Sequence, residues 1–367
     1  MRAASQPLRR KLASEVQIRP YSPGPNTKRK ALIVNRKFLP SALAIITSLI
    51  VVLNTAAQTK SNRSASGTET LSYLPASDGV MLIDVRRLLN ETLPHVFADD
   101  SAKLAQVNSE IDKFKTETGV DPRSLNRVVV GTRYVYPSPS VTKVETVAIA
   151  HGTFDAKAIA AAGRAKANGR YREEKYRGAT MMIFSINDQM RLLGFWKMKV
   201  SDLAVCALDA KTLAIGTVTT VRAAIEAGRA GNRANNDLVS LASRDPSAVV
   251  GFGANVTSGL LANLNVGSDT MAKDINSIKQ VYGSIGSTQT DVSLLMVARA
   301  DTADAARNLS DTLIGLKQIA TVFIMRMAPA RKALAQSALD NLKITTRGNE
   351  LEIRTQFAAA SLASLVK

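Results

Sequence analysis

Hydrophobic and polar positions divide the chain into three parts with different patterns. Residues 1–37 are basic and irregular, and Phe38 to Leu53 then form an apolar run of 16 residues without a charge. After Gln58, strand-like alternation and helix-like periodicity follow each other, as in a folded domain. The run bears on where the protein is located, and the part after it bears on the fold.

The apolar run and its continuation to Ala57 predict a membrane-spanning helix. Such a helix needs about 20 predominantly apolar residues, and 38–57 supplies this length with Asn54 as its only strongly polar residue. A cleaved export signal is the alternative, because Thr55-Ala56-Ala57 is an acceptable cleavage site. A buried helix of a soluble protein fits less well, since the run has no polar face. We favour the uncleaved anchor.

Charges beside the run predict its orientation. Residues 1–57 contain ten Lys or Arg, including Arg36 and Lys37, and a single acid, Glu15. Basic flanks remain in the cytoplasm. We therefore expect a single-pass protein of the inner (cytoplasmic) membrane with residues 58–367 in the periplasm, or a secreted protein if cleavage follows Ala57. Phe38–Ala57 would contact the bilayer, with anionic headgroups near Arg36 and Lys37.

The net charge raises nucleic-acid binding as a second possible role for the N-terminal tail. The whole chain has 48 Lys+Arg and 30 Asp+Glu, a net charge of +18, and residues 1–57 hold half of this excess. Nucleic acid could bind by the same electrostatics, but Tyr21 is the only aromatic residue of the tail for stacking. We therefore assign residues 1–37 as a basic disordered cytoplasmic tail and do not expect nucleic-acid binding. The true start could also lie nearer the apolar run.

The rest of the chain predicts an α+β fold in two similar units. Residues 58–71 are expected to be a flexible linker, 72–230 the first unit and 240–367 the second. In the first unit we expect strands at Gly79–Val85, Arg127–Val135 and Lys143–His151, helices at Ser101–Thr118, Ala156–Ala167 and Val218–Ala227, and hairpins Tyr176–Ile186/Gln189–Val200 and Leu203–Leu208/Thr212–Gly216.

The second unit is expected to repeat this order. We expect strands at Ala248–Ala254 and Asp291–Ala300, helices at Thr270–Tyr282, Ala303–Met327 and Ala358–Val366, and a hairpin Leu342–Arg347/Glu350–Gln356 around Gly348-Asn349. Pro329 should break or kink the long helix. Because 146–155 resembles 293–301 and 203–227 resembles 342–366, the sequence predicts a duplicated unit with antiparallel sheets covered by helices.

Candidate chemistry is sparse. Cys206 is the only cysteine, lies in an apolar stretch and is expected to be a buried structural thiol. His95 and His151 have no metal-ligand spacing, and Asp84, Asp99 and Asp100 fit cap or loop roles better than a cation site. Three motif-like stretches depart from their families' patterns: Gly251-Phe252-Gly253, Ser140 with Lys143, and Gly283 to Gly286, which we expect to be a turn. We predict no catalytic, cofactor-binding or metal-binding residue.

Two apolar features leave alternatives open. Met181, Met182, Met190 and Met198 gather on one predicted hairpin with Phe184, Phe195 and Trp196, where hydrophobic packing is favoured over a soft-metal site, and an interaction surface stays open. The stretch Ile319–Met325 is apolar on nearly all sides of its helix. It is either central in the core or a face that binds a partner.

The layout resembles uncharacterised exported bacterial proteins with one N-terminal membrane anchor and a repeated α+β ectodomain. The similarity is carried by Leu74-Pro75-Ala76-Ser77-Asp78-Gly79-Val80 and by Thr212-Leu213-Ala214-Ile215-Gly216-Thr217 before a helix, and it implies no activity. We expect a membrane-anchored binding or structural protein of the bacterial cell envelope with an envelope protein as partner. An envelope enzyme, such as a hydrolase, is the alternative.

Overall fold

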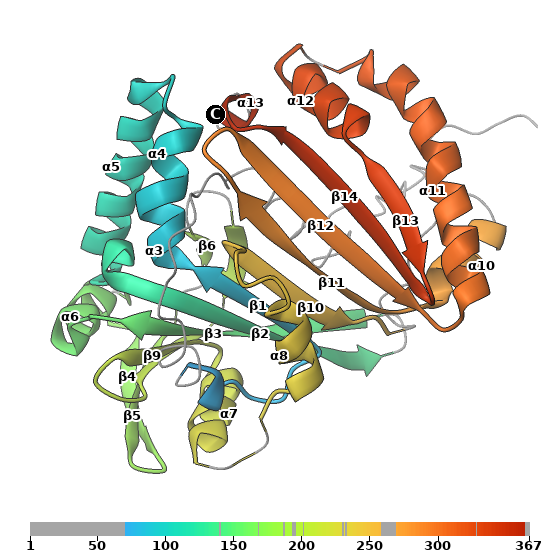
Figure 1. Cartoon of the computed structure of the whole chain (residues 1–367). Helices are drawn as coiled ribbons and strands as arrows, with labels where there is room; N and C mark the ends of the chain where they lie inside the picture. The colour runs from blue at the N-terminus through green and yellow to red at the C-terminus, as the bar shows by residue number, and fades with distance from the viewer. Residues whose placement is uncertain are drawn as a thin grey trace, which may run out of the picture. The chain divides into compact units, whose positions relative to one another are not determined.

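The computed structural model describes residues 70–138, 141–167, 169–185, 188–192, 196–200, 202–229, 231, 233–257, 269–327 and 329–363. Twelve strands form one antiparallel sheet, two form a separate pair, and helices pack on both faces of the large sheet (Figure 1). The strands are β1 Gly79–Asp84, β2 Leu125–Ser138, β3 Val141–Gly152, β4 Tyr171–Tyr176, β5 Ala179–Phe184, β6 Asp188–Leu192, β7 Trp196–Val200, β8 Leu203–Ala207, β9 Thr212–Gly216, β10 Val250–Asn255, β11 Ile278–Ser287, β12 Asp291–Ala300, β13 Lys343–Arg347 and β14 Glu350–Ala358.

The helices connect and cover these strands. They are α3 Val85–Arg87, α4 Leu93–Val96, α5 Ser101–Thr118, α6 Ala156–Ala167, α7 Val218–Gly228, α8 Asn236–Ala242, α10 Asp269–Asn276, α11 Ala303–Ile324, α12 Pro329–Asp340 and α13 Ala360–Ala363, with a π-helical turn at Leu88–Thr92 and a 3₁₀ turn at Pro122–Ser124. The predicted α+β class with antiparallel pairing is confirmed.

The large sheet is continuous across both halves of the chain. Its order is β13-β14-β12-β11-β10-β1-β2-β3-β9-β8-β5-β4, and β1 pairs antiparallel with β10 at the centre. Read outward from this pair, one side runs β1, β2, β3, β9, β8 and the other runs β10, β11, β12, β14, β13. On each side, three strands that are consecutive in the sheet are followed by a hairpin. The second strand of that hairpin, β9 or β14, lies next to the three, and the first, β8 or β13, lies outside it.

Alternation along the strands gives the sheet two faces. Met81 and Ile83 lie on the face packed by α4–α6 and α11–α13, which we call the α11 face. Val80 and Leu82 lie on the opposite face, packed by α7 and α8, which we call the α8 face. Burial of these two apolar sets stabilises the sheet by about 25 cal/mol per Å² of apolar surface removed from water.

Local signals place most helix ends where the sequence predicts them. α5 has the predicted bounds and ends at Gly119, which adopts the left-handed conformation with φ 72°. The Thr217 side chain accepts a hydrogen bond from the Thr220 amide at the start of α7, and Thr302 does the same for Ala305 at the start of α11. α11 ends before Pro329, which begins α12, because proline is tolerated in the first turn of a helix.

The predicted hairpin around Asn187-Asp188 is wrong. β4 and β5 form the hairpin instead, turning at Arg177 (φ 47°) and Gly178 (φ 79°), the two positive φ values of a type I′ turn. β5 then pairs with β8, while β6 and β7 pair only with each other in a separate sheet. The two-residue turn at Arg177-Gly178 joins β4 to β5, so the hairpin forms one strand earlier in the chain than the Asn187-Asp188 pair predicted.

The predicted helix Thr270–Tyr282 and the predicted turn at Gly283 to Gly286 are also wrong. α10 ends at Asn276, and residues 278–287 form β11 between β10 and β12. A Cβ on Gly283 would lie 2.0 Å from the Leu295 carbonyl oxygen of β12. The glycine therefore allows close approach of two strands rather than a turn.

Two expected bounds also change. The linker expected at 58–71 ends earlier, because residues 70–72 are helical and Thr70 is buried. The helix expected at Ala358–Val366 begins at Ala360, because Ala358 is the last residue of β14.

Other expectations fall outside the described residues. The tail 1–37, the apolar run 38–57 and residues 58–69 of the linker lie outside them, as do Ser140, Asn187 and Phe195. No helix in the described part of the chain is long and apolar enough to cross a membrane. The hairpins β8–β9 and β13–β14 form as predicted, with Gly348 at φ 59° in the second turn.

Candidate functional site

Cys206 is buried in β8, between Met181 of β5 and Ala214 of β9. Burial raises the pKa of the Cys206 thiol to about 11. At neutral pH the sulfur is therefore a protonated, apolar packing group, because only the thiolate is a strong nucleophile. The predicted burial of this cysteine is confirmed.

The two histidines are not brought together. His95 lies on α4, with its Nδ1 atom 2.5 Å from the Glu91 carbonyl oxygen. His151 is buried in β3, in register with Arg127 and Thr212, and its strand position faces the α8 side. α4 packs on the opposite face. The sheet therefore separates the two rings.

The candidate acids and motifs have structural roles. The side chains of Asp84 and Asp100 accept amide hydrogen bonds at the starts of α3 and α5, and Asp99 lies in the turn before Asp100. Gly251-Phe252-Gly253 lies within β10 and Lys143 pairs with Glu145 at 2.9 Å. The described residues contain no group of three or more His, Cys, Asp or Glu that could hold a metal ion.

The methionines do not share one hairpin. Met181 and Met182 are buried in β5 of the large sheet, while Met190 and Met198 are register partners in the separate β6–β7 pair. This corrects the predicted cluster, whose premise was the wrong hairpin. For Met181 and Met182 the packing interpretation is confirmed.

A hollow of about 450 Å³ lies between β4, β5, β8 and the start of α6. Glu173 and Arg229 are its charged lining residues, beside Ala156, Ala179, Met182 and Leu208. Glu173 already accepts a hydrogen bond from Arg164 at 2.8 Å and another from Tyr171. This lining offers no activated nucleophile with a base in hydrogen-bond reach.

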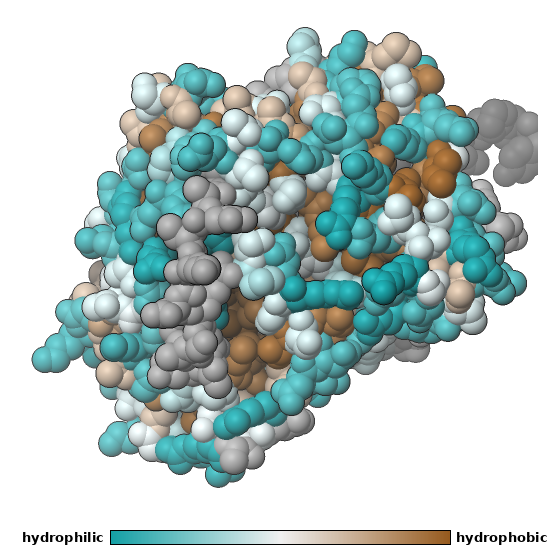
Figure 2. Space-filling view, viewed as in Figure 1, coloured by the Kyte–Doolittle hydropathy of each residue, from teal (hydrophilic) through white to brown (hydrophobic). Residues whose placement is uncertain are grey.

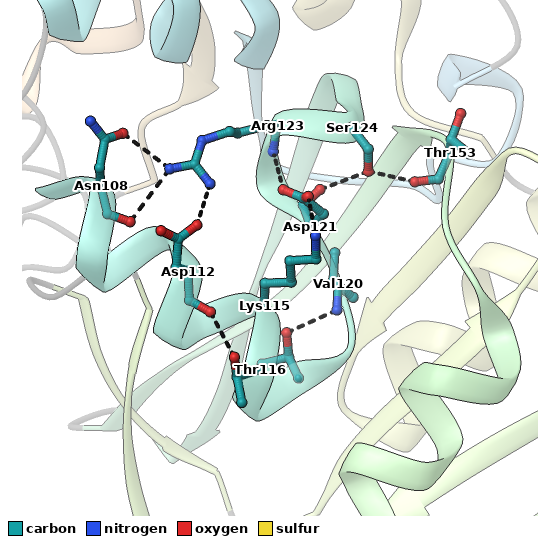
Figure 3. Close-up of polar contacts among 10 residues, drawn as sticks. Asn108, Asp112, Lys115, Thr116, Val120, Asp121, Arg123, Ser124 and Thr153 are labelled. Carbon is teal, nitrogen blue, oxygen red and sulfur yellow. Dashed lines mark hydrogen bonds and ion pairs between the residues drawn. The ribbon is translucent and has the colours of Figure 1, made fainter.

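The end of α5 is fastened to the sheet by polar contacts (Figure 3). Arg123 donates to Asp112 at 2.6 Å and to the Asn108 side chain at 3.0 Å, and Lys115 pairs with Asp121 at 2.9 Å. Burial acts to raise the pKa of Asp121, but hydrogen bonds from Lys115 and the Arg123 amide and their charges outweigh it and lower the pKa. This cluster secures the turn from α5 into β2.

A second polar network lies on the α8 face over the C-terminal half of the sheet. The described helices that pack on β12–β14 lie on the α11 face, and hydrophilic side chains dominate the exposed side of these strands in Figure 2. Arg299 donates to Glu350 at 2.9 Å and to Gln280 at 2.6 Å, and Arg244 donates to the Tyr282 hydroxyl.

The ionisation of this network is set by its own members. Burial acts to raise the pKa of Glu350, but hydrogen bonds from Arg299 and Tyr282 outweigh it and lower the pKa. Burial and the neighbouring Glu350 raise the pKa of Tyr282. The charges of Arg299 and Glu350 satisfy each other, so this arrangement stabilises the exposed strands and holds no poised acid or base.

In the described residues, most of the large hydrophobic side chains that are exposed to solvent lie on α11 or just after it. Exposed apolar side chains follow its C-terminal half, with Ile319 51%, Val322 49% and Phe323 60% exposed. Ile314 and Leu316 on α11, and Met325 and Met327 just after it, are also exposed. Hydrophobic side chains show over α11 in the upper right of Figure 2. We call these seven residues the α11 surface.

The inner side of α11 explains which alternative holds. Ala306, Leu309 and Ile324 are buried, and the first two pack with Ala298 and Leu351 of the sheet. Between Ile314 and Phe323 the apolar side chains on the outer side meet solvent. The alternative in which Ile319–Met325 is central in the core is therefore wrong, apart from Ile324, and the binding alternative stays a prediction.

Sequence reasoning missed the polar network around Arg299 and Glu350. Its two members on β11, Gln280 and Tyr282, alternate with Val281 and Gly283. This period-two pattern was available from the sequence, but two glycines within ten residues obscured it.

Comparisons with known proteins add little beyond this geometry. No protein-family model matches the chain, and no curated protein matches its sequence. Among solved structures, crystal form III of TP0453 gives a TM-score of 0.42 with 10% identity, covering 81% of this chain and 96% of that one. Crystal form I gives 0.42 with 10% identity, covering 83% and 98%. TM-scores this low do not assign a fold family or a function.

Proposed function

We propose that this chain is a membrane-anchored binding or structural protein of the bacterial cell envelope. Phe38–Ala57 would anchor it in the inner membrane, with residues 1–37 in the cytoplasm and residues 58–367 extracytoplasmic. The charge asymmetry around the apolar run supports this location. No chemistry is part of the proposal.

The observation that carries the binding role is the α11 surface. Monomeric soluble proteins rarely expose contiguous apolar patches larger than a few hundred Å², and larger ones mark interaction sites. Here the side chains of Ile319, Val322 and Phe323 are all about half or more exposed on one helix. An enzyme would instead bring titratable groups together in a cavity, whereas the groups traced above are paired with one another.

We also propose that the ectodomain arose by duplication of one unit. Strands β1-β2-β3-β9-β8 and β10-β11-β12-β14-β13 have corresponding order about the β1–β10 pair, which supports this. The proposed units remain 72–230 and 240–367.

Two measurements test the proposal. A reporter that is active only after export, fused behind Lys367, should be active, whereas a reporter active only in the cytoplasm should not. A photo-activated cross-linking residue at Ile319 should capture a protein in intact cells, and the same residue at Lys113, exposed on α5, should not. Equal capture at both positions, or cytoplasmic reporter activity, contradicts the proposal.

A further inference from the structure

The outer side of α11 carries an apolar strip with one charged residue beyond each end. With about 100° of rotation per residue, Gly315, Ile319 and Val322 fall opposite the buried Ala306 and Ile324. Asp311 comes one turn before this apolar strip and Arg326 one turn after it, and both are exposed. The strip is therefore bounded by an acid at one end and a base at the other.

Gly315 has no local reason to be glycine. A Cβ added there would meet nothing within 4 Å, and the residue lies in the interior of a helix. Glycine at such a position destabilises a helix by about 0.5–1 kcal/mol relative to alanine. The missing side chain leaves open space beside the helix backbone, which a body outside the described residues could occupy.

The two bounding charges are available for pairing. Neither Asp311 nor Arg326 forms an ion pair with another described residue. In the same helix Asp304 and Arg307 do pair with each other, and Lys317 donates to the Leu342 carbonyl oxygen at 2.7 Å. Both side chains are exposed, so they can pair with charges of a body that covers the strip.

We propose that this body is a second copy of the chain, with two α11 helices packed antiparallel about a twofold axis. One register satisfies three conditions at once. It places Asp311 opposite Arg326 of the second copy, Gly315 opposite the branched Val322, and Ile319 beside the axis. A twofold interface requires such a self-complementary surface, because each contact occurs twice.

The inference deepens the proposed binding function and rests on it for the α11 surface being an interaction site. Small residues let two helix backbones approach closely, which Gly315 permits against the side chain of Val322. One helix pair is small beside a standard interface of about 1,600 Å². Confinement of both copies to one bilayer would raise their effective concentration and offset this.

An anionic lipid surface is the main competing occupant. From Thr312 to Leu339 the chain carries four bases, Lys317, Arg326, Arg331 and Lys332, and no acid, a composition that anionic headgroups attract. A lipid surface gives no role to Asp311, which repels it. The two occupants therefore respond differently to reversal of that charge.

The test uses the full-length protein in detergent and in lipid nanodiscs, with sedimentation velocity to measure self-association. Asp311→Arg and Arg326→Asp should each weaken dimerisation at least about tenfold, because each brings like charges together. The double variant Asp311→Arg/Arg326→Asp should restore dimerisation to within about threefold of wild type, since the pair reappears with its signs exchanged. Thermal unfolding, measured at concentrations where every protein is monomeric, should be unchanged in all three variants.

Cross-linking checks the register with a short thiol-reactive reagent. Ile319→Cys should cross-link to itself, whereas Asn308→Cys, on the same side of α11 but far from the axis, should not. Wild type, whose only cysteine is the buried Cys206, serves as the blank. Gly315→Leu should weaken dimerisation although it adds apolar surface and favours the helix.

Three results would overturn the dimer. A protein that stays monomeric at all concentrations contradicts the dimer. If the export reporter behind Lys367 is still active in that case, the proposed location is unaffected. Failure of the double variant to restore association also contradicts the dimer. So does tighter binding of Asp311→Arg to phosphatidylglycerol vesicles with unchanged sedimentation, which would identify a lipid surface as the occupant.

Discussion

The two longest helices in the described residues, α5 and α11, pack on the same face of the sheet but differ on their outer sides. The outer side of α5 is polar, and its C-terminal end is fastened by Arg123, Asp112 and the Lys115–Asp121 pair. The outer side of α11 is apolar around Ile319 and Phe323. The polar outer side of α5 is paired within the chain, whereas α11 leaves apolar side chains exposed to solvent, and this contrast is why we propose a partner for α11.

The largest expected change in unfolding free energy comes from substitution on the inner side of α11, and substitution on its outer side should have little effect. Leu309→Ala should lower the free energy of unfolding by about 2–5 kcal/mol, because Leu309 is buried against Ala298 and Leu351. Ile319→Ala should change it by less than about 0.5 kcal/mol, since its side chain is 51% exposed. Urea denaturation of the monomeric full chain measures both. Similar losses at the two positions would mean that Ile319 is part of the fold.

The next effect concerns the fastening of α5. Arg123→Ala should destabilise the protein by about 1 kcal/mol, with about 0.5 kcal/mol of this coupled to Asp112 in a double-mutant cycle, because the Asp112 side chain is 66% exposed and its pair is screened. Arg307→Ala in α11, which breaks an exposed pair with Asp304, is the matched control and should have a smaller effect. Zero coupling between Arg123 and Asp112 would contradict the assigned role.

These contrasts show how much of the fold the sequence could predict. Ends set by local chemistry were found: Gly119 after α5, Thr302 before α11 and Gly348 between β13 and β14. Pairing set by distant residues was not. β1 pairs with β10 across the chain, and β11 depends on Gly283 lying against Leu295. Nothing within a short window reveals either contact.

The candidate surface was predictable only as an alternative. The apolar composition of Ile319–Met325 is visible in the sequence, but which side meets solvent depends on where α11 lies against β12–β14. The helix has a buried inner side and an exposed outer side that are both apolar, so periodicity could not separate them. The polar network of Arg299 and Glu350 was missed because β11, the strand that carries Gln280 and Tyr282, was not predicted from the sequence.

The smallest effect is a pH dependence confined to the α5 side. Because the folded pKa of Asp121 is lowered, its ionised form stabilises the fold above its ordinary pKa of about 4, and this contribution is lost as pH falls through the folded pKa. Asp121→Asn should therefore be less stable than wild type at pH 6, by about 0.5 kcal/mol, and nearly equal to it at pH 2.5. Denaturant titrations at both values measure the difference. A constant difference across this range would show that Asp121 acts through something other than its charge.

Our proposals together predict that the outer side of α11 is covered when the protein is in the membrane that we propose for it. Thiol-labelling rates of Ile319→Cys and Lys113→Cys, measured with a membrane-impermeant maleimide in native membranes and after dilution into detergent, test this directly. Lys113→Cys on α5 should label at one rate in both conditions, while Ile319→Cys should be slow in membranes and fast after dilution. Equal, fast labelling of both cysteines in native membranes would contradict the claim.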